Sequence, residues 1–186
     1  MVTRARFVLL LFALLLALSR AALAQVERAG VTLPERLDAG GQQFDLVACG
    51  VRDTLWITHY VSAIYVPPGA APVQAVSDPS WAKLVRVVIV NGTWLPDDIP
   101  EEYREPLRED LARDPFGLFQ RYYQNLAAGD VINALYLPGR GVALSVNGRM
   151  VATEPGHDLI EELMKAWSEA DPVTKRLHRL IMNNPC

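Results

Sequence analysis

The dipeptide Asn147-Gly148 constrains the fold of this chain more than any other short feature. It separates two strand-like segments, residues 142–146 and 149–153. Asn-Gly readily adopts the positive φ angles that a two-residue hairpin turn requires, so the sequence predicts a β-hairpin here. Residues 131–137 form a further strand-like segment just before it. Because consecutive strands joined by short turns are antiparallel, the sequence predicts an antiparallel sheet.

Earlier segments extend this sheet. Residues 43–66 predict two strands, the second of which, residues 55–66, is rich in β-branched and aromatic side chains. Residues 83–90 are apolar almost throughout, which is typical of a central strand covered on both faces. Residues 25–42 are polar and Gly-rich apart from one short apolar piece, and residues 67–80 predict a loop rich in Pro and Ala.

Helix signals occur between these strands and after the last of them. Glu105 and Asp114 each precede a proline, as an N-cap residue precedes Pro at the first helical position. An aromatic stripe with helical spacing follows, and we expect it to pack in the core: Phe116, Phe119, Tyr122, Tyr123 and Leu126. Two more helices are expected around residues 159–167 and from Asp171. This order predicts an α+β fold, a large antiparallel sheet with helices packed on one face, in a single domain of residues 25–186.

Residues 1–24 predict a signal peptide. Arg4 and Arg6 give a positive start, an apolar run over residues 7–19 follows, and small residues precede a cut after Ala24. The run is shorter than the 20 or so residues that cross a bilayer, although an uncleaved anchor is the alternative. We therefore expect a periplasmic or secreted protein with no membrane span after cleavage.

Charge and cysteine content narrow the classes of partner. Without the three arginines of residues 1–24, the chain has 15 basic and 21 acidic side chains, a net charge of −6. An acidic chain without a basic run is a poor nucleic-acid binder. Cys49 and Cys186 form either a disulfide, which export permits, or two separate thiols. The three histidines are scattered without ligand spacing, so no metal site is expected.

Motifs of catalysis are absent from the sequence. There is no glycine-rich phosphate loop, HExxH, CxxC or GxSxG pattern, so no cofactor is expected. Glu161 and Glu162 are adjacent on a predicted helix, where neighbouring side chains point in different directions. They therefore predict a solvated helix face and no acid/base pair.

The segment from Gly50 to Tyr65 is the best candidate for a binding site. Trp56, Thr58 and Tyr60 share one face of the predicted strand, and this mixture of bulk and hydroxyls can line a ligand cleft. Arg52 lies just before it, and its fork of donors suits a carboxylate or phenolate. The alternative, a surface arginine beside an ordinary half-buried strand, is favoured by spacing alone.

Four blocks of sequence follow one another in a characteristic order. They are Gly50-Val51-Arg52 with residues 56–66, Gly129-Asp130 with residues 136–141, Val146-Asn147-Gly148, and Trp167 with Asp171, Pro172 and Lys175. In this order they resemble the signature of the bacterial chalcone isomerase-like family, over roughly residues 31–182. The resemblance implies an open-faced β-sandwich with a large antiparallel sheet, helices over one face and a ligand cleft between them.

The resemblance also implies roles for Arg52 and Tyr60. In the plant enzymes of this superfamily the arginine matching Arg52 steadies a charged oxygen of the substrate, and a threonine stands at the position of Tyr60. In fatty-acid-binding relatives an arginine and a tyrosine hold a carboxylate, and this chain fits that version. The enzymes' Tyr/Lys/Asn helix cluster has only Tyr103 as a candidate, and their late threonine falls near residues 165–166, which carry no hydroxyl.

Three hypotheses result. The first is an exported, non-catalytic binder of a fatty acid or similar amphiphilic carboxylate. Its ligand-binding residues are expected to be Arg52, Trp56, Thr58 and Tyr60. The second is an isomerase or intramolecular lyase of the chalcone type. The third is an envelope scaffold that uses the fold for protein contacts.

Overall fold

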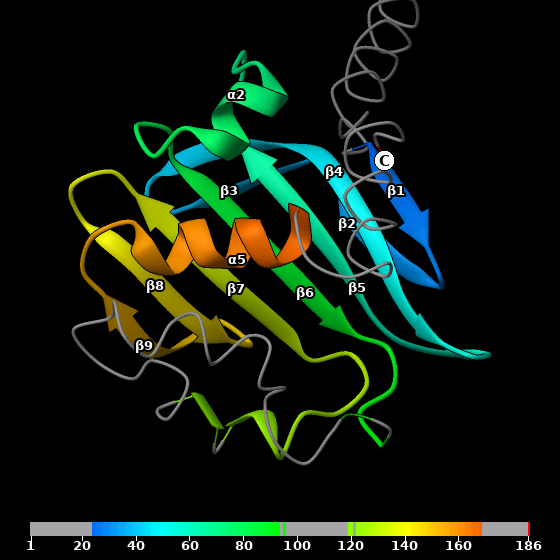
Figure 1. The fold of residues 1–186 in the computed structure, drawn as a ribbon. Helices are drawn as coiled ribbons and strands as arrows, with labels where there is room; N and C mark the ends of the chain where they lie inside the picture. Colours follow the sequence, from blue (N-terminus) through cyan, green and yellow to red (C-terminus); the bar gives the residue numbers. More distant parts are fainter. Residues whose placement is uncertain (1–23, 94, 96–118, 121, 169–185) are drawn as a thin grey trace, which may run out of the picture.

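The chain folds around one large sheet. The computed structural model describes residues 24–93, 95, 119–120, 122–168 and 186. Seven antiparallel strands lie side by side in chain order, as Figure 1 shows. They are β3 (Arg36–Ala39), β4 (Gln42–Thr54), β5 (Ile57–Val66), β6 (Lys83–Ile89), β7 (Val131–Leu137), β8 (Gly141–Val146) and β9 (Arg149–Glu154). The predicted antiparallel sheet is thus confirmed.

Helix α5 (Asp158–Ser168) crosses one face of this sheet, which we call the α5 face (Figure 1). Leu159 and Ile160 of the helix are almost fully buried. They belong to the same core as Val85 and Leu144 of the strands. Burying a large aliphatic side chain contributes about 1.5–3 kcal/mol, so this packing accounts for the attachment of the helix. The predicted helix around residues 159–167 and its position over the sheet are confirmed.

The opposite face has a core of its own. A two-stranded hairpin, β1 (Gln25–Arg28) and β2 (Val31–Pro34), contributes Leu33, whose side chain is fully buried. Leu84 of β6 belongs to this core, whereas its neighbour Val85 belongs to the core of the α5 face. The prediction that residues 83–90 form a central strand covered on both faces is confirmed.

Two parts of the chain differ from expectation. Residues 25–42 form three short strands, although their composition predicted none. The expected loop of residues 67–80 contains a short helix, α2 (Pro72–Ser77), whose start is favoured by Pro at its first position. The helices expected after Glu105 and from Asp171 lie outside the described residues. Of the aromatic stripe expected after Asp114, Phe116 also lies outside them. The rest pack in the core of the α5 face as predicted: Phe119 and Leu126 are buried there, and Tyr122 and Tyr123 pack against it. In the described part of the chain, no helix combines the length and apolar character needed to cross a membrane.

The Asn147-Gly148 turn forms as predicted. Both residues have positive φ, 50° and 77°. The Asn147 side chain also makes hydrogen bonds outside the turn. Its Oδ1 accepts from the backbone N of Val131 at 2.8 Å, and its Nδ2 donates to Asp130 Oδ1 at 2.8 Å. The backbone N–H of Ala127 and then this amide hold the pKa of Asp130 below its ordinary value. The turn therefore also fixes the start of β7.

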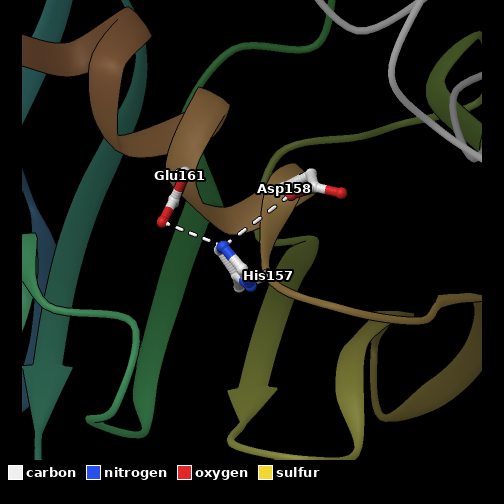
Figure 2. Close-up of side chains that lie close together, drawn as sticks. All are labelled: His157, Asp158 and Glu161. Atoms are coloured by element: carbon white, nitrogen blue, oxygen red, sulfur yellow. Dashed lines mark ion pairs between the residues drawn. The ribbon is translucent and has the colours of Figure 1, made fainter.

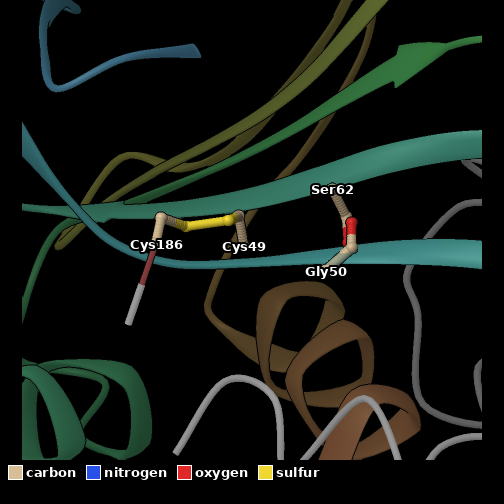
Figure 3. Close-up of a disulfide and its surroundings, with 4 residues drawn as sticks. All are labelled: Cys49, Gly50, Ser62 and Cys186. Atoms are coloured by element: carbon tan, nitrogen blue, oxygen red, sulfur yellow. A yellow bond between two sulfur atoms is a disulfide. The ribbon is translucent and has the colours of Figure 1, made fainter. Parts of the chain in front are cut away.

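Cys49 and Cys186 are joined by a disulfide (Figure 3), with their Cα atoms 5.4 Å apart. Cys49 is buried on β4 and belongs to the core opposite the α5 face, where Cys186 packs as well. The bond fixes Cys186 to the middle of β4, the strand next to the β3 edge of the sheet. Of the two possibilities that the sequence left open, the structure has the disulfide.

Candidate functional site

Arg52 and Tyr60 are directly opposite each other on β4 and β5. Side chains of an antiparallel pair point to the same side, with Cβ atoms about 4.5–5.5 Å apart. Both residues are half-buried. Tyr60 packs against the core of the α5 face, so the pair lies on that face. The structure therefore brings together the two residues that the resemblance singled out.

Apolar side chains continue the α5 face beyond this pair. Ile89 of β6 is opposite Tyr60 and is buried. Two residues before Ile89 on β6, Val87 is opposite Ile132 of β7, which is in turn opposite Val146 of β8. All three are half-buried and pack against the same core. We call these three residues the apolar row. A forked cation and a phenol thus border a half-buried aliphatic surface.

The next cross-strand pair, Gly50 and Ser62, is used internally. Ser62 is buried, and its hydroxyl donates to the carbonyl oxygen of Gly50 at 3.4 Å, as seen beside the disulfide in Figure 3. The serine hydroxyl therefore has a partner within the sheet.

Trp56 lies in the turn and not on the strand, which corrects the sequence-based expectation. β5 begins at Ile57, and Thr54 pairs with Ile57, so Leu55 and Trp56 form the two-residue turn between β4 and β5. The Trp56 side chain is 86% exposed. Composition placed the strand start two residues too early, because the large apolar residues Leu55 and Trp56 precede the strand without a break.

Thr58 lies close to the same turn. Its Oγ1 donates to Asp53 Oδ1 at 2.8 Å, where the register between β4 and β5 shifts by one residue. This bond ties the two strands together next to the turn. Of the four expected ligand-binding residues, the structure therefore pairs Arg52 with Tyr60 and places Thr58 and Trp56 towards the tip of the hairpin.

Lys83 is a buried cation that sequence analysis did not single out. It is 1% exposed, and its Nζ donates to the carbonyl oxygens of Val76 at 2.9 Å and Asp78 at 3.1 Å. Burial lowers its pKa from the ordinary lysine value. These carbonyls lie at the end of α2, where a cation compensates unpaired backbone oxygens. Lys83 thus holds α2 against the sheet, a role that needs no ligand.

His157, Asp158 and Glu161 form the one group of potential metal ligands in the described part of the chain (Figure 2). The His157 Nε2 lies 3.3 Å from Glu161 Oε1 and 3.8 Å from Asp158 Oδ1. The side chains are 33–51% exposed. Acidic residues in the first turn of a helix interact favourably with its dipole, and residues four apart are neighbours. Helix stability therefore accounts for this cluster, and we assign no metal to it.

The large antiparallel sheet and its covering helix agree with the fold class that the sequence predicted. The chain matches the model of the chalcone isomerase-like family over residues 25–182 and belongs to that family. No curated protein sequence matches it. Among solved structures it is similar to a fatty-acid binding protein of Arabidopsis thaliana, AtFAP1, with a TM-score of 0.55 and 13% identity over 85% of this chain and 95% of that one. At this identity the likeness shows the fold.

Proposed function

We propose that this protein is a non-catalytic binder of a fatty acid or a similar amphiphilic carboxylate. The observation that carries the proposal is the cross-strand pair of Arg52 and Tyr60 beside the apolar row. Arg52 donates two N–H groups to the carboxylate, in the geometry that a guanidinium fork favours. The Tyr60 hydroxyl donates a third hydrogen bond, and the alkyl tail lies along the apolar row.

The dimensions and energies suit such a ligand. From Tyr60 on β5 to Val146 on β8 are three strand spacings, about 14 Å, a length comparable with an extended alkyl tail. Burying about ten methylenes at ~0.8 kcal/mol each contributes roughly 8 kcal/mol before ordering costs. Micromolar affinity corresponds to about 8 kcal/mol, so the charge-assisted bonds need only offset those costs.

The place of action that we propose is the periplasm or the exterior of the cell. Residues 1–24 have the pattern of a cleaved signal peptide. The disulfide between Cys49 and Cys186 supports export, because such bonds form and persist in oxidising compartments. The similarity to AtFAP1, a fatty-acid binding protein, supports the ligand class.

Native mass spectrometry of the exported chain, residues 25–186, tests the proposal. We expect a carried-through mass of fatty-acid size, or one acquired from a panel of saturated fatty acids. Arg52→Ala should lose it, whereas Arg140→Ala, which removes an exposed arginine in a turn, should keep it. A parent protein that stays in its apo mass throughout the panel would rule out this function.

An isomerase of the chalcone type is the second candidate, since membership of the chalcone isomerase-like family and the presence of Arg52 favour it. It predicts that the protein speeds the loss of the visible absorbance of a chalcone above the spontaneous rate, and that Arg52→Ala abolishes the acceleration. Equal rates with and without protein would exclude it.

A further inference from the structure

The tip of the β4–β5 hairpin carries two large apolar side chains in water. Leu55 is 82% and Trp56 is 86% exposed. The hairpin projects beyond the neighbouring strand, as Figure 1 shows, because the last residue of β6 in the ladder, Ile89, pairs with Tyr60. After β6, Val90 and Asn91 still donate to the carbonyl oxygen of His59. Two residues of β5, Ile57 and Thr58, about 7 Å of strand, therefore reach past the neighbouring chain before the turn.

Leu55 is in a conformation that leucine adopts at a cost. Its φ is +56°, in the left-handed region, where a non-glycine residue costs on the order of 1–3 kcal/mol. Two other tight turns pair a small or amide residue at positive φ, Ala29 or Asn147, with a following glycine, whereas here Leu55 is followed by Trp56. At the tip the chain keeps a large side chain that buries little of its surface. Folding stability gives no reason for this choice, so it indicates a function of the exposed surface.

The size of the tip limits what it can bind. Two side chains of this kind offer on the order of 300–400 Å², whereas each partner in a stable protein interface buries roughly 800 Å². Their neighbours Asp53 and Thr54 are polar and exposed. A small apolar knob with a polar collar suits the bilayer interface, where Trp is enriched and an apolar surface sinks about 5–10 Å below the headgroups.

We propose that Leu55 and Trp56 form an interfacial anchor that inserts into the headgroup region of a lipid bilayer. Residues 25–186 carry a net charge of −6, so the anchor acts through apolar contact and does not depend on anionic lipid. Tyr60 follows Trp56 by four residues, about 13 Å along the strand. Insertion therefore holds Arg52 and Tyr60 near the lipid surface. The insertion itself does not depend on the proposed function, whereas the access of these two residues to lipid rests on it.

Flotation of residues 25–186 with vesicles of zwitterionic phosphatidylcholine tests this anchor. Leu55→Gly removes the side chain and suits the positive φ, so its thermal stability should equal or exceed that of the parent. We expect its vesicle partition coefficient to fall about tenfold or more, and that of Trp56→Ser likewise. Met150→Ser, a change at an exposed apolar residue away from the tip, should partition as the parent does.

Three outcomes would overturn the proposal that Leu55 and Trp56 form a membrane anchor. They are a parent protein that does not float, a Leu55→Gly variant that floats as well as the parent, and variants that weaken self-association while leaving flotation unchanged. Fatty-acid affinity of Leu55→Gly without vesicles should equal that of the parent. Vesicle binding and ligand binding can therefore fail separately.

Discussion

Removing the disulfide between Cys49 and Cys186 should destabilise the protein by an amount set by the loop that it closes. The two residues are 137 positions apart. In the chain-entropy account, a cross-link of that span lowers the entropy of the unfolded chain by about 17 cal/mol/K, or about 5 kcal/mol at 25 °C. Because measured losses for native disulfides reach this value only at their upper end, we expect the free energy of unfolding to fall by about 3–5 kcal/mol.

Urea unfolding of residues 25–186 measures this loss. The variants are Cys49→Ala, Cys186→Ala and the double variant, compared with the oxidised and the reduced parent. All three variants and the reduced parent should lose the same amount, because each lacks the same bond. With an m-value of about 2 kcal/mol/M, the midpoint moves down by about 1.5–2.5 M.

Additive losses would refute this reasoning. If the double variant lost the sum of the two single losses, each cysteine would contribute through its own packing. An oxidised parent that alkylates at two thiols after unfolding, without prior reduction, would show that the bond is absent. In either case the support that the disulfide gives to export would also be lost.

Three further changes test the packing of the sheet. Burial raises the pKa of Tyr65 to about 12, so the stability of the fold should fall as pH rises from 10 towards 12, where the unfolded chain already loses the phenolic proton. Tyr65→Phe should remove that fall and raise the free energy of unfolding by about 1 kcal/mol at neutral pH, because the buried hydroxyl has no hydrogen-bond partner among the described residues. If stability fell equally steeply with alkaline pH in the parent and in Tyr65→Phe, this prediction would be wrong. In urea unfolding, Asn147→Ala should lower the free energy of unfolding by about 2–3 kcal/mol, and Asn147→Gly should lower it less, since glycine keeps the positive φ. Equal losses in the two variants would show that the turn conformation is irrelevant. Leu159→Ala should cost about 2–5 kcal/mol by the same assay, and a loss below 1 kcal/mol would mean that α5 is not anchored there.

The strands that could be predicted are those whose signal is local. Asn147-Gly148 specifies its hairpin through backbone conformations that these two residues adopt easily. Residues 83–90 predict a central strand because both faces are apolar, and the structure places a core on each side of β6.

The elements that could not be predicted depend on distant contacts. The strands of residues 25–42 alternate exposed and half-buried positions and expose much of their polar surface. Their structure relies on burying Leu33 against the far face of the sheet, which composition cannot show. Likewise α2 is six residues long, too short to be stable alone, and Lys83 from β6 holds its end.

The candidate site was predictable only in part for the same reason. A shift of one residue in register would have put Arg52 and Tyr60 on opposite faces, and no local pattern fixes the register of β4 and β5. The resemblance to related sequences supplied the pair. Alternation alone put Trp56 beside them, because it could not tell that the strand begins only at Ile57.

The most direct test of the account compares the affinity of the protein for a saturated fatty acid and for the fatty alcohol of equal length, by calorimetry, in the parent and in Arg52→Ala. The alcohol shares the tail and lacks the carboxylate, so it isolates the charge-assisted bonds from the apolar row. A hydrogen bond to a charged group contributes about 1.5–3 kcal/mol, which predicts that the parent prefers the acid by about tenfold or more. Arg52→Ala should lose this preference while still binding the alcohol. A parent that binds acid and alcohol equally, or an Arg52→Ala variant that keeps the preference, would contradict the central claim that Arg52 holds a carboxylate.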